Sequence, residues 1–349
     1  MTLSFFLLLT ASLFLLQIVL LCYLVIRKKR RQRYEEEVES QYNHLVEPFS
    51  SYMMEPSDVR FFYAIRSIKH QEVVLERLLN GYVAFTKEAH SSPLVKQLSE
   101  RFLTEPYRQR LNRRNWAKRI NTLHYIEDFH MVSLSPVLLE QLAISNKLDA
   151  ETRQLIRTLA SLDETKVLTE LSRFSNAPLR LYADVFSRLK KETAVKEIQS
   201  ALESTDLSLK HAALIFVGQS GSLAFLPAVE KELAVPHAET RIQALKAIFR
   251  LEYMSDPDLL APFFKSEIWA ERMFAARIAG ILQLSRYKET LGILLGDSVW
   301  WVRYSAAEAF THFSDGDLLL AHLAENHPDR YGRDMAAQWQ IYQPGGARQ

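Results

Sequence analysis

A basic residue recurs about every thirty-one positions through the C-terminal half of the chain. The intervals between these residues are 30, 31, 31, 31 and 30, and an alanine follows each of them after three positions. A fixed period of this length is produced by stacked supersecondary units, so the chain is predicted to form an array of repeats. We call the six basic residues the marker residues: Arg180, Lys210, Arg241, Arg272, Arg303 and Arg333.

The clearest unit surrounds the fifth marker residue. It runs from Asp297 to Phe310 and reads DSVWWVRYSAAEAF. Its small residues allow close helix packing, and its apolar residues continue at helical spacing. The segment resembles the second helix of a HEAT repeat, of the short kind also found in phycobilisome-lyase-like arrays, which reads Asp-x-x-x-x-Val-Arg-x-x-Ala-Ala-x-Ala-Leu. The resemblance covers about residues 145–342 and implies an all-α chain folded as a HEAT-like α-solenoid, within a membrane-anchored bacterial HEAT repeat protein.

The N-terminus predicts a transmembrane helix over residues 1–26. No charged residue occurs from Leu3 to Ile26. These twenty-four residues would extend about 36 Å as a helix, and a hydrocarbon core measures about 30 Å. A cleaved signal peptide is the alternative, but its basic start and its small-residue cleavage site are missing.

A basic cluster follows this apolar stretch and predicts its orientation. Lys and Arg beside a span stay on the cytoplasmic side. We therefore expect a single-pass protein of the inner or plasma membrane, with its N-terminus outside and its C-terminal domain cytoplasmic. Residues 27–56 are expected to form a charged helical stalk that Pro48 and Pro56 interrupt. The cluster consists of Arg27, Lys28, Lys29, Arg30, Arg31 and Arg33.

Residues 57–144 are helical by pattern but do not keep the period, so they are predicted to be degenerate repeats. Residues 343–349 are predicted to be a flexible tail. Six basic residues stand within 108–119, beside Tyr107 and Trp116. This segment leaves open a lipid or nucleic-acid binder, with an exposed helix face as the simpler interpretation. The formal net charge is only +2, so no nucleic acid is expected as a partner.

Residues that carry chemistry are sparse. His124, Glu127, Asp128 and His130 lie close together in sequence, which leaves open a metal-dependent or lyase-type HEAT enzyme. One HEAT-like enzyme family, the deoxyhypusine hydroxylases, binds iron through His-Glu dipeptides, and this chain contains none. The single cysteine, Cys22, and the lack of a glycine-rich phosphate loop add no site. We predict no catalytic residue, no cofactor and no metal, and therefore no enzyme.

Aromatic residues beside the markers predict a partner-binding edge. Trp269 and Trp300 each lie three residues before a marker, with Trp301 and Tyr304 next to the second. Tryptophan and tyrosine are favoured where proteins bind each other. Covering the end of the core is the alternative role for these side chains.

The markers themselves are predicted to be structural. Each lies near a helix start, from which its side chain can reach acidic or carbonyl groups of the adjoining turn. The expected partners are Asp206, Glu267 and Asp297.

The function expected from these features is binding. We expect a membrane-anchored cytosolic HEAT-repeat scaffold that positions a protein partner, itself associated with the membrane. An accessory subunit of an envelope polysaccharide or glycosyltransferase system is the specific hypothesis. The membrane itself is the second expected partner, through the N-terminal helix.

Overall fold

The computed structural model describes residues 2–86, 92–174 and 177–341, without the side chains of residues 2–4, 6–11 and 341. Throughout these ranges the regular elements are helices and no strand occurs. The predicted tail 343–349 lies outside the described residues. The chain divides into two compact units, Met1–Gln141 and Leu142–Gln349, which are taken in turn. The all-α prediction is confirmed.

The first unit is built on one long helix, whose C-terminal half packs against shorter ones. Phe49 and Tyr52 on this helix are buried, and their rings lie 5.6 and 5.8 Å from the ring of Phe61 on the next helix. The elements are α1 (Thr2–Met54), α2 (Arg60–Ser67), α3 (Gln71–Phe85), α4 (Pro93–Leu111), α5 (Trp116–Asp128), the 3-10 helix η2 (Val132–Leu134) and α6 (Ser135–Ile144), which continues into the second unit.

The predicted transmembrane helix is wrong. Within the described ranges no helix is long and apolar enough to cross a membrane. The uncharged side chains that the structure describes in succession run from Ser12 to Ile26, and Arg27 follows at once. The remainder of the expected segment, residue 1 and the side chains of residues 2–4 and 6–11, lies outside the described part.

The localisation drawn from that helix is wrong for the same reason. We expected a single pass through an inner or plasma membrane, with the N-terminus outside and the C-terminal domain cytoplasmic, and no helix in the described ranges can form that span. The six basic residues from Arg27 to Arg33 lie exposed on α1, where Arg31 Nε donates to Glu35 Oε1 at 2.7 Å. That hydrogen bond raises the pKa of Arg31.

The sequence predicted that Pro48 interrupts this helix, and that prediction is wrong. Pro48 lies inside α1, which ends at Met54, two residues before Pro56. A proline near a helix end removes one hydrogen bond, and burial of Leu45, Phe49 and Tyr52 holds the helix together on both sides of it.

The second unit contains the period. Its elements alternate between short first helices and longer second helices, and the markers lie on the second helices. The order is α7 (Ala150–Ser161), α8 (Lys166–Ser172), α9 (Leu179–Arg188), α10 (Lys191–Glu203), α11 (Leu207–Ser220), η3 (Leu223–Phe225), α12 (Leu226–Lys231), η4 (Glu232–Ala234), α13 (Ala238–Leu251), η5 (Pro257–Lys265), α14 (Trp269–Ile281), η6 (Ser285–Tyr287), α15 (Lys288–Leu294), α16 (Trp300–Phe310), α17 (Gly316–Asn326) and α18 (Arg330–Ile341).

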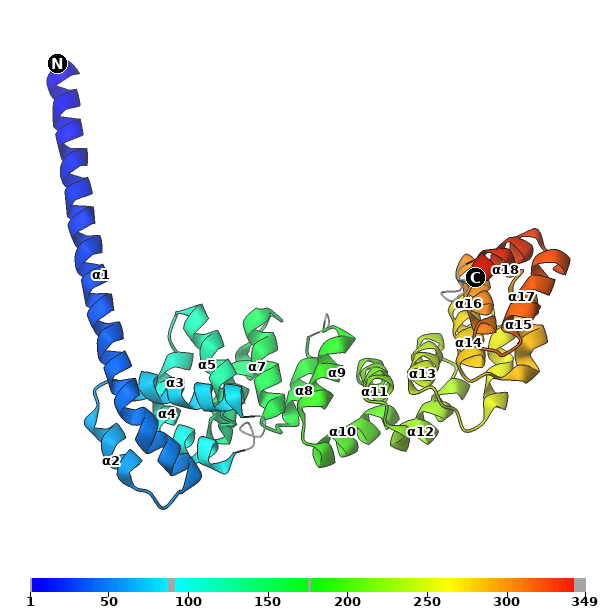
Figure 1. Ribbon diagram of the computed structural model, residues 1–349, viewed down its shortest axis with the longest axis horizontal. Coiled ribbons are helices and arrows are strands. Elements are labelled where there is room, and N and C mark those ends of the chain that lie inside the picture. The colour runs from blue at the N-terminus through cyan, green and yellow to red at the C-terminus, as the bar shows by residue number, and fades with distance from the viewer. Residues whose placement is uncertain (1, 87–91, 175–176, 342–349) are drawn as a thin grey trace, which may run out of the picture. The chain divides into compact units, whose positions relative to one another are not determined.

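The second helices form one continuous row. Each contacts the next, in the order α7, α9, α11, α13, α14, α16 and α18 (Figure 1). The alanine three positions after each marker is buried in this row, with 0–3% of its surface exposed. A methyl group at that position lets the backbones approach closely, as in other helix contacts between small residues. The array of helical repeats expected from the period is therefore present.

The contacts between successive second helices alternate between small side chains and aromatic side chains. Gly218 on α11 faces Ala247 on α13, and Gly280 on α14 faces Ala309 on α16. The intervening contacts are aromatic: ring centroids lie 5.9 Å apart for Phe186–Phe216, 6.3 Å for Phe249–Phe274 and 5.0 Å for Tyr304–Trp339. Close and wide contacts therefore follow each other along the row.

Candidate functional site

The marker residues hold the turn in front of each second helix. From Lys210 onward each marker is the fourth residue of its helix. In the four arginine markers from Arg241 onward the guanidinium folds back, and its Nη1 donates to the carbonyls six and five residues earlier. These distances are 3.0 and 2.7 Å for Arg241, 2.7 and 3.2 Å for Arg272, 2.7 and 3.2 Å for Arg303, and 2.7 and 3.1 Å for Arg333.

Three markers also bind an acid from the following repeat. Lys210 Nζ lies 3.1 Å from both carboxylate oxygens of Glu232, and Arg241 Nε donates to Glu271 Oε1 at 2.7 Å. Arg272 holds Asp297 with two hydrogen bonds, Nε to Oδ2 at 2.7 Å and Nη2 to Oδ1 at 2.9 Å, which raise the pKa of Arg272. Each of these ion pairs joins one repeat to the next.

Two of the three expected partners contact their markers, and they do so through carbonyl groups of the adjoining turn. Glu267 and Asp297 reach Arg272 and Arg303 through their backbone carbonyls. The carboxylate of Asp297 belongs instead to the preceding marker, Arg272. The carboxylate of Asp206 accepts from the backbone N–H groups of Ser208 and Leu209 and so caps α11.

Sequence reasoning missed two of the acids, Glu232 and Glu271. The separations from marker to acid are 22, 30 and 25 residues, as the pairs Lys210–Glu232, Arg241–Glu271 and Arg272–Asp297 give. Because these separations differ, the acids do not recur with the period of the markers, and the period alone does not predict them.

The proposed partner-binding edge is centred on α16. The rings of Trp300 and Trp301 meet edge to face at 4.7 Å, and the ring of Tyr304 lies 5.0 Å from Trp300. Trp339 on α18 lies 5.0 Å from Tyr304, a contact that the sequence analysis did not anticipate. We call Trp300, Trp301, Tyr304 and Trp339 the aromatic group. Trp300 is 42% exposed and Trp301 54%.

Trp269 stands apart from this group. It is the first residue of α14, as Trp300 is of α16, and it is 43% exposed. In the part of the chain that the structure describes, its ring makes no aromatic contact with Trp300. The structure therefore brings together three of the four predicted partner-binding residues and leaves Trp269 separate.

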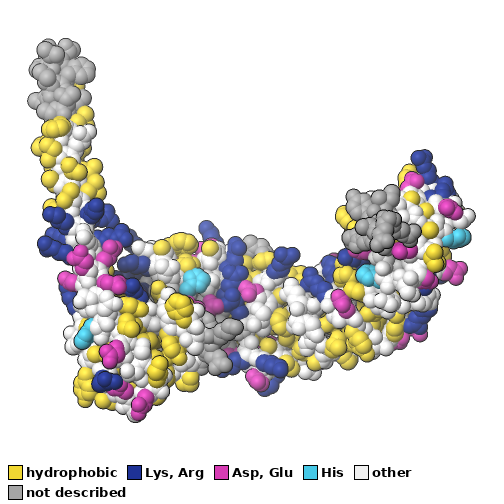
Figure 2. All heavy atoms as spheres, in the orientation of Figure 1, with side chains coloured by type: hydrophobic (Ala, Val, Ile, Leu, Met, Phe, Trp, Pro, Cys, Tyr) yellow, Lys and Arg dark blue, Asp and Glu magenta, His cyan; other side chains and the backbone are white. Residues whose placement is uncertain are grey.

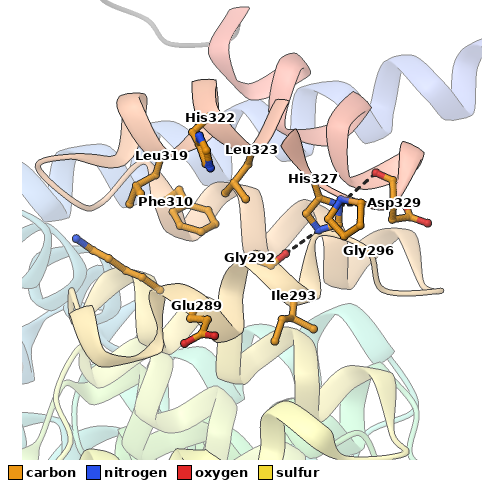
Figure 3. A pocket seen from close by; sticks show the side chains of 12 residues that line it. Glu289, Gly292, Ile293, Gly296, Phe310, Leu319, His322, Leu323, His327 and Asp329 are labelled. Carbon is orange, nitrogen blue, oxygen red and sulfur yellow. Dashed lines mark hydrogen bonds between the residues drawn. The ribbon is translucent and has the colours of Figure 1, made fainter. Parts of the chain in front are cut away.

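A hollow of about 530 Å³ lies between α15, α17 and the turn before α18 (Figure 3). Its walls are mostly apolar, with Ile293, Phe310, Leu319 and Leu323 among them. His327 stands at one end of the hollow, where its Nδ1 accepts from the backbone N–H of Asp329 at 3.1 Å. Its Nε2 therefore carries the hydrogen and donates to the carbonyl of Gly292 at 3.0 Å. Both ring nitrogens of His327 therefore hold hydrogen bonds to the backbone.

The basic segment 108–119 is divided between two helices and a turn. Arg110, near the end of α4, pairs with the buried Glu76 and lies 3.0 Å from Glu72. Burial raises the pKa of Glu76, and Arg110 acts in the opposite direction. Arg119 Nη1 donates to the carbonyl of Arg113 at 2.8 Å. Two of the six basic side chains thus serve the fold of the first unit.

Among the described residues, the histidines and acids from His124 to His130 do not form a cluster that could hold a metal ion. In the described ranges no three His, Cys, Asp or Glu side chains lie close enough together to hold a metal ion. His124, Glu127 and Asp128 stand on α5, and His130 follows it with a φ of 51°. That the chain is not an enzyme stays a prediction.

Comparison with known proteins gives fold likenesses only. No family model matches the chain, and no curated protein matches it significantly. Similar solved structures include an engineered protein (15% identity, TM-score 0.36, 86% of this chain and 87% of that one) and Escherichia coli YibA (15%, 0.43, 74% and 98%). The complex of CpcE and CpcF of phycocyanin lyase from Nostoc is also similar (16%, 0.27, 68% and 93%). At these identities and TM-scores the likenesses do not indicate what the chain binds.

Proposed function

We propose that the chain is a binding protein whose stacked repeats hold a protein partner through the aromatic group. The observation that carries this proposal is the exposure of Trp300 and Trp301, at 42% and 54%, although the two rings lie against each other and beside Tyr304. Two neighbouring tryptophans that keep about half of their surface in water leave apolar area that a partner can bury.

The residue types suit such a surface. Tryptophan and tyrosine dominate the binding energy of many protein interfaces, and each combines a large apolar body with a polar tip. Beside the group, the Arg303 guanidinium lies 5.1 Å from the ring centroid of Tyr331, which is 64% exposed. An arginine at the rim of an aromatic surface is also typical of interfaces.

The start of α16 is held rigidly, which favours binding. Arg303 donates to the carbonyls of Asp297 and Ser298, and Asp297 accepts the backbone N–H of Val299 at 2.8 Å. Trp300 and Trp301 follow directly on this turn. A surface that is ordered before the partner arrives loses less conformational entropy on binding.

The partner is a protein that covers Trp300 and Trp301 with an apolar or aromatic side chain. The finer hypothesis of an envelope polysaccharide or glycosyltransferase system has no support in the described residues and is not part of the proposal. The membrane anchor belongs to the correction above and is likewise not part of it.

The test compares the full chain with a Trp300→Ala/Trp301→Ala variant. Crosslinking in the native cells identifies the proteins bound to the wild type, and each is then purified and its Kd measured. We expect the double variant to weaken binding by about thirtyfold or more, which corresponds to a loss of about 2 kcal/mol. Both side chains are exposed, so the melting temperature should remain close to that of the wild type.

Trp116→Ala is the matched control, because Trp116 is also 54% exposed and also begins a helix, α5 of the first unit. It should leave the Kd unchanged. A partner that binds the double variant as tightly as the wild type would refute the aromatic group as the contact surface.

A further inference from the structure

A second hollow lies on the row of second helices, away from the aromatic group. It measures about 250 Å³ and is lined from three successive helices, α9, α11 and α13. Its α13 residues, Gln243, Lys246, Ala247 and Arg250, stand at positions i, i+3, i+4 and i+7, so they share one face of that helix. The other lining residues are Arg180 on α9 and Leu214, Ile215 and Gln219 on α11.

The charged residues of this hollow are all basic. Arg180, Lys246 and Arg250 line it, and no acid does. Arg180 and Arg250 are exposed, and Lys246 is half-buried with its Nζ 5.8 Å from the ring centroid of Phe274. Figure 2 shows lysine and arginine side chains along the edge that these helices form.

The three cations contrast with their neighbours on the same row. Asp184 on α9 accepts from Arg157 at 2.6 Å and from Arg188 at 3.0 Å, and Arg277 on α14 lies 3.3 Å from Glu308. Within the ranges that the structure describes, neither Arg180 nor Arg250 forms an ion pair. Like charges around one hollow repel each other, so this arrangement costs stability unless an anion enters.

Gly218 stands where α11 and α13 come close together, beside Arg250. A Cβ added to Gly218 would lie 2.9 Å from the Cα of Ala247 and 3.4 Å from Cδ of Arg250. The glycine therefore allows α11 to pack closely against α13, next to the side chain of Arg250. Glu239, one turn before Gln243, does not line the hollow, and its Oε1 accepts from Gln243 Nε2 at 2.6 Å.

We propose that this hollow binds the phosphate group of inorganic phosphate or of a small phosphate monoester. Two guanidinium forks match the paired oxygens of a phosphate, and the lysine adds a third positive charge for a dianion. Pockets for drug-sized ligands measure about 300–1,000 Å³, so a hollow of about 250 Å³ suits a smaller group. The site goes beyond the proposed function and shares no residue with the aromatic group.

Calorimetric titration of the full chain tests the site, with sodium phosphate and glycerol phosphate as ligands and sodium chloride at equal ionic strength as the blank. We expect one saturable site per chain. Arg250→Gln and Lys246→Gln should each weaken it by about tenfold or more, because each removes a charge-assisted hydrogen bond. Tighter binding of glycerol phosphate would identify a phosphorylated small molecule as the ligand, and equal binding would identify phosphate itself.

Lys196→Gln is the matched control, because Lys196 is exposed on α10, loses the same charge and does not line the hollow. Its affinity should equal that of the wild type. Phosphate should also raise the melting temperature of the wild type and of this control, but not that of Arg250→Gln.

If a hollow variant does not fold, Arg180→Gln, which alters an exposed side chain on another helix, provides the same comparison. The proposal would be overturned by heats no larger than those of the chloride blank. It would also be overturned by equal affinity in the wild type and Arg250→Gln, or by an acidic peptide that binds this hollow when phosphate does not.

Discussion

The Cα atom of Ala309 lies where a side chain on Gly280 would have to go. A Cβ added to Gly280 would lie 2.5 Å from that Cα and 2.7 Å from the Ala309 Cβ. Real Cβ atoms do not approach backbone this closely, so α14 and α16 can contact each other here only because residue 280 has no side chain.

Gly280→Ala should therefore destabilise the second unit. The added methyl group meets backbone, which cannot rotate away, and overpacking of this kind costs about 1–3 kcal/mol. Urea denaturation followed by circular dichroism measures the change. Gly81→Ala is the matched control, because Gly81 lies within α3 with nothing within 4 Å of an added Cβ. That substitution should be neutral or stabilise by up to about 1 kcal/mol, and equal losses in the two variants would contradict this account.

Glu271→Ala should be among the most destabilising single changes in the chain. Glu271 is 2% exposed, and its carboxylate accepts from Arg241 Nε at 2.7 Å and from Ser266 Oγ at 2.5 Å. Removing it leaves the cation of Arg241 without its partner, which costs about 3–5 kcal/mol. A double-mutant cycle with Arg241→Ala measures the coupling from denaturation midpoints. Additive losses would show that the two residues do not act as a pair.

Asp297 should tolerate asparagine better than alanine. Its Oδ1 accepts the backbone N–H of Val299, which an amide oxygen also does. The two hydrogen bonds from Arg272 use both carboxylate oxygens, and in asparagine one of these is replaced by an NH2 group that cannot accept. We expect Asp297→Asn to cost about 1.5–3 kcal/mol and Asp297→Ala about 1 kcal/mol more, from the lost cap. Asp258→Asn is the control, because Asp258 is 74% exposed in its pair with Arg286. Its effect should stay within about 0.5 kcal/mol, and equal stability of the two Asp297 variants would argue against the capping role.

The stability of the second unit should fall on acidification through pH 6.5. Burial lowers the pKa of His211 below its usual 6.5, Glu239 and Glu232 act against this shift, and His237 and Lys210 add to it. In the folded chain Nε2 of this ring lies 2.8 Å from Thr240 Oγ1. Below pH 6.5 the unfolded chain binds more protons at this residue than the folded chain. The contribution of His211 to the free energy of unfolding therefore falls as the pH drops from 6.5 to the folded pKa, and it is constant above 6.5.

His211→Gln removes this titration and keeps a polar side chain beside Thr240. The difference in unfolding free energy between the wild type and the variant should change between pH 7.5 and pH 5.5, with the wild type losing more. A constant difference over that range would show that His211 does not titrate differently in the folded and unfolded states.

The second helices are the part of the fold that the sequence predicts best. Their alanines are buried against the neighbouring helix. Because the close packing there leaves no space for a larger side chain, alanine recurs at the same position of each repeat. The first helices are less regular. Residues 223–234 combine a six-residue α-helix with two 3-10 helices, and Pro257–Lys265 is a 3-10 helix with Pro262 inside it. Prolines remove the N–H groups that an α-helix needs there.

The candidate site was predictable only in part. Trp300, Trp301 and Tyr304 are neighbours in sequence, so their contact follows from helix geometry. Trp339 joins them from the next repeat, and that pairing depends on the wide contact between α16 and α18. The phosphate hollow was missed for a related reason. Arg180, Lys246 and Arg250 are separated by up to seventy residues, and only the stacking of α9, α11 and α13 places them around one hollow.

The ion pairs of the markers also determine which segment of this chain can be duplicated, deleted or grafted as a module. Arg241 pairs with Glu271, and Arg272 pairs with Asp297, each acid lying one repeat further along the chain. A segment that begins and ends with a whole helix pair would therefore contain the arginine without the acid that pairs with it. The module that can be duplicated, deleted or grafted without such a loss therefore begins at one marker turn and extends through the acid of the next. Arrays shortened or lengthened by this overlapping module should fold, while a junction that separates Lys210, Arg241 or Arg272 from its acid should leave an unmatched charge.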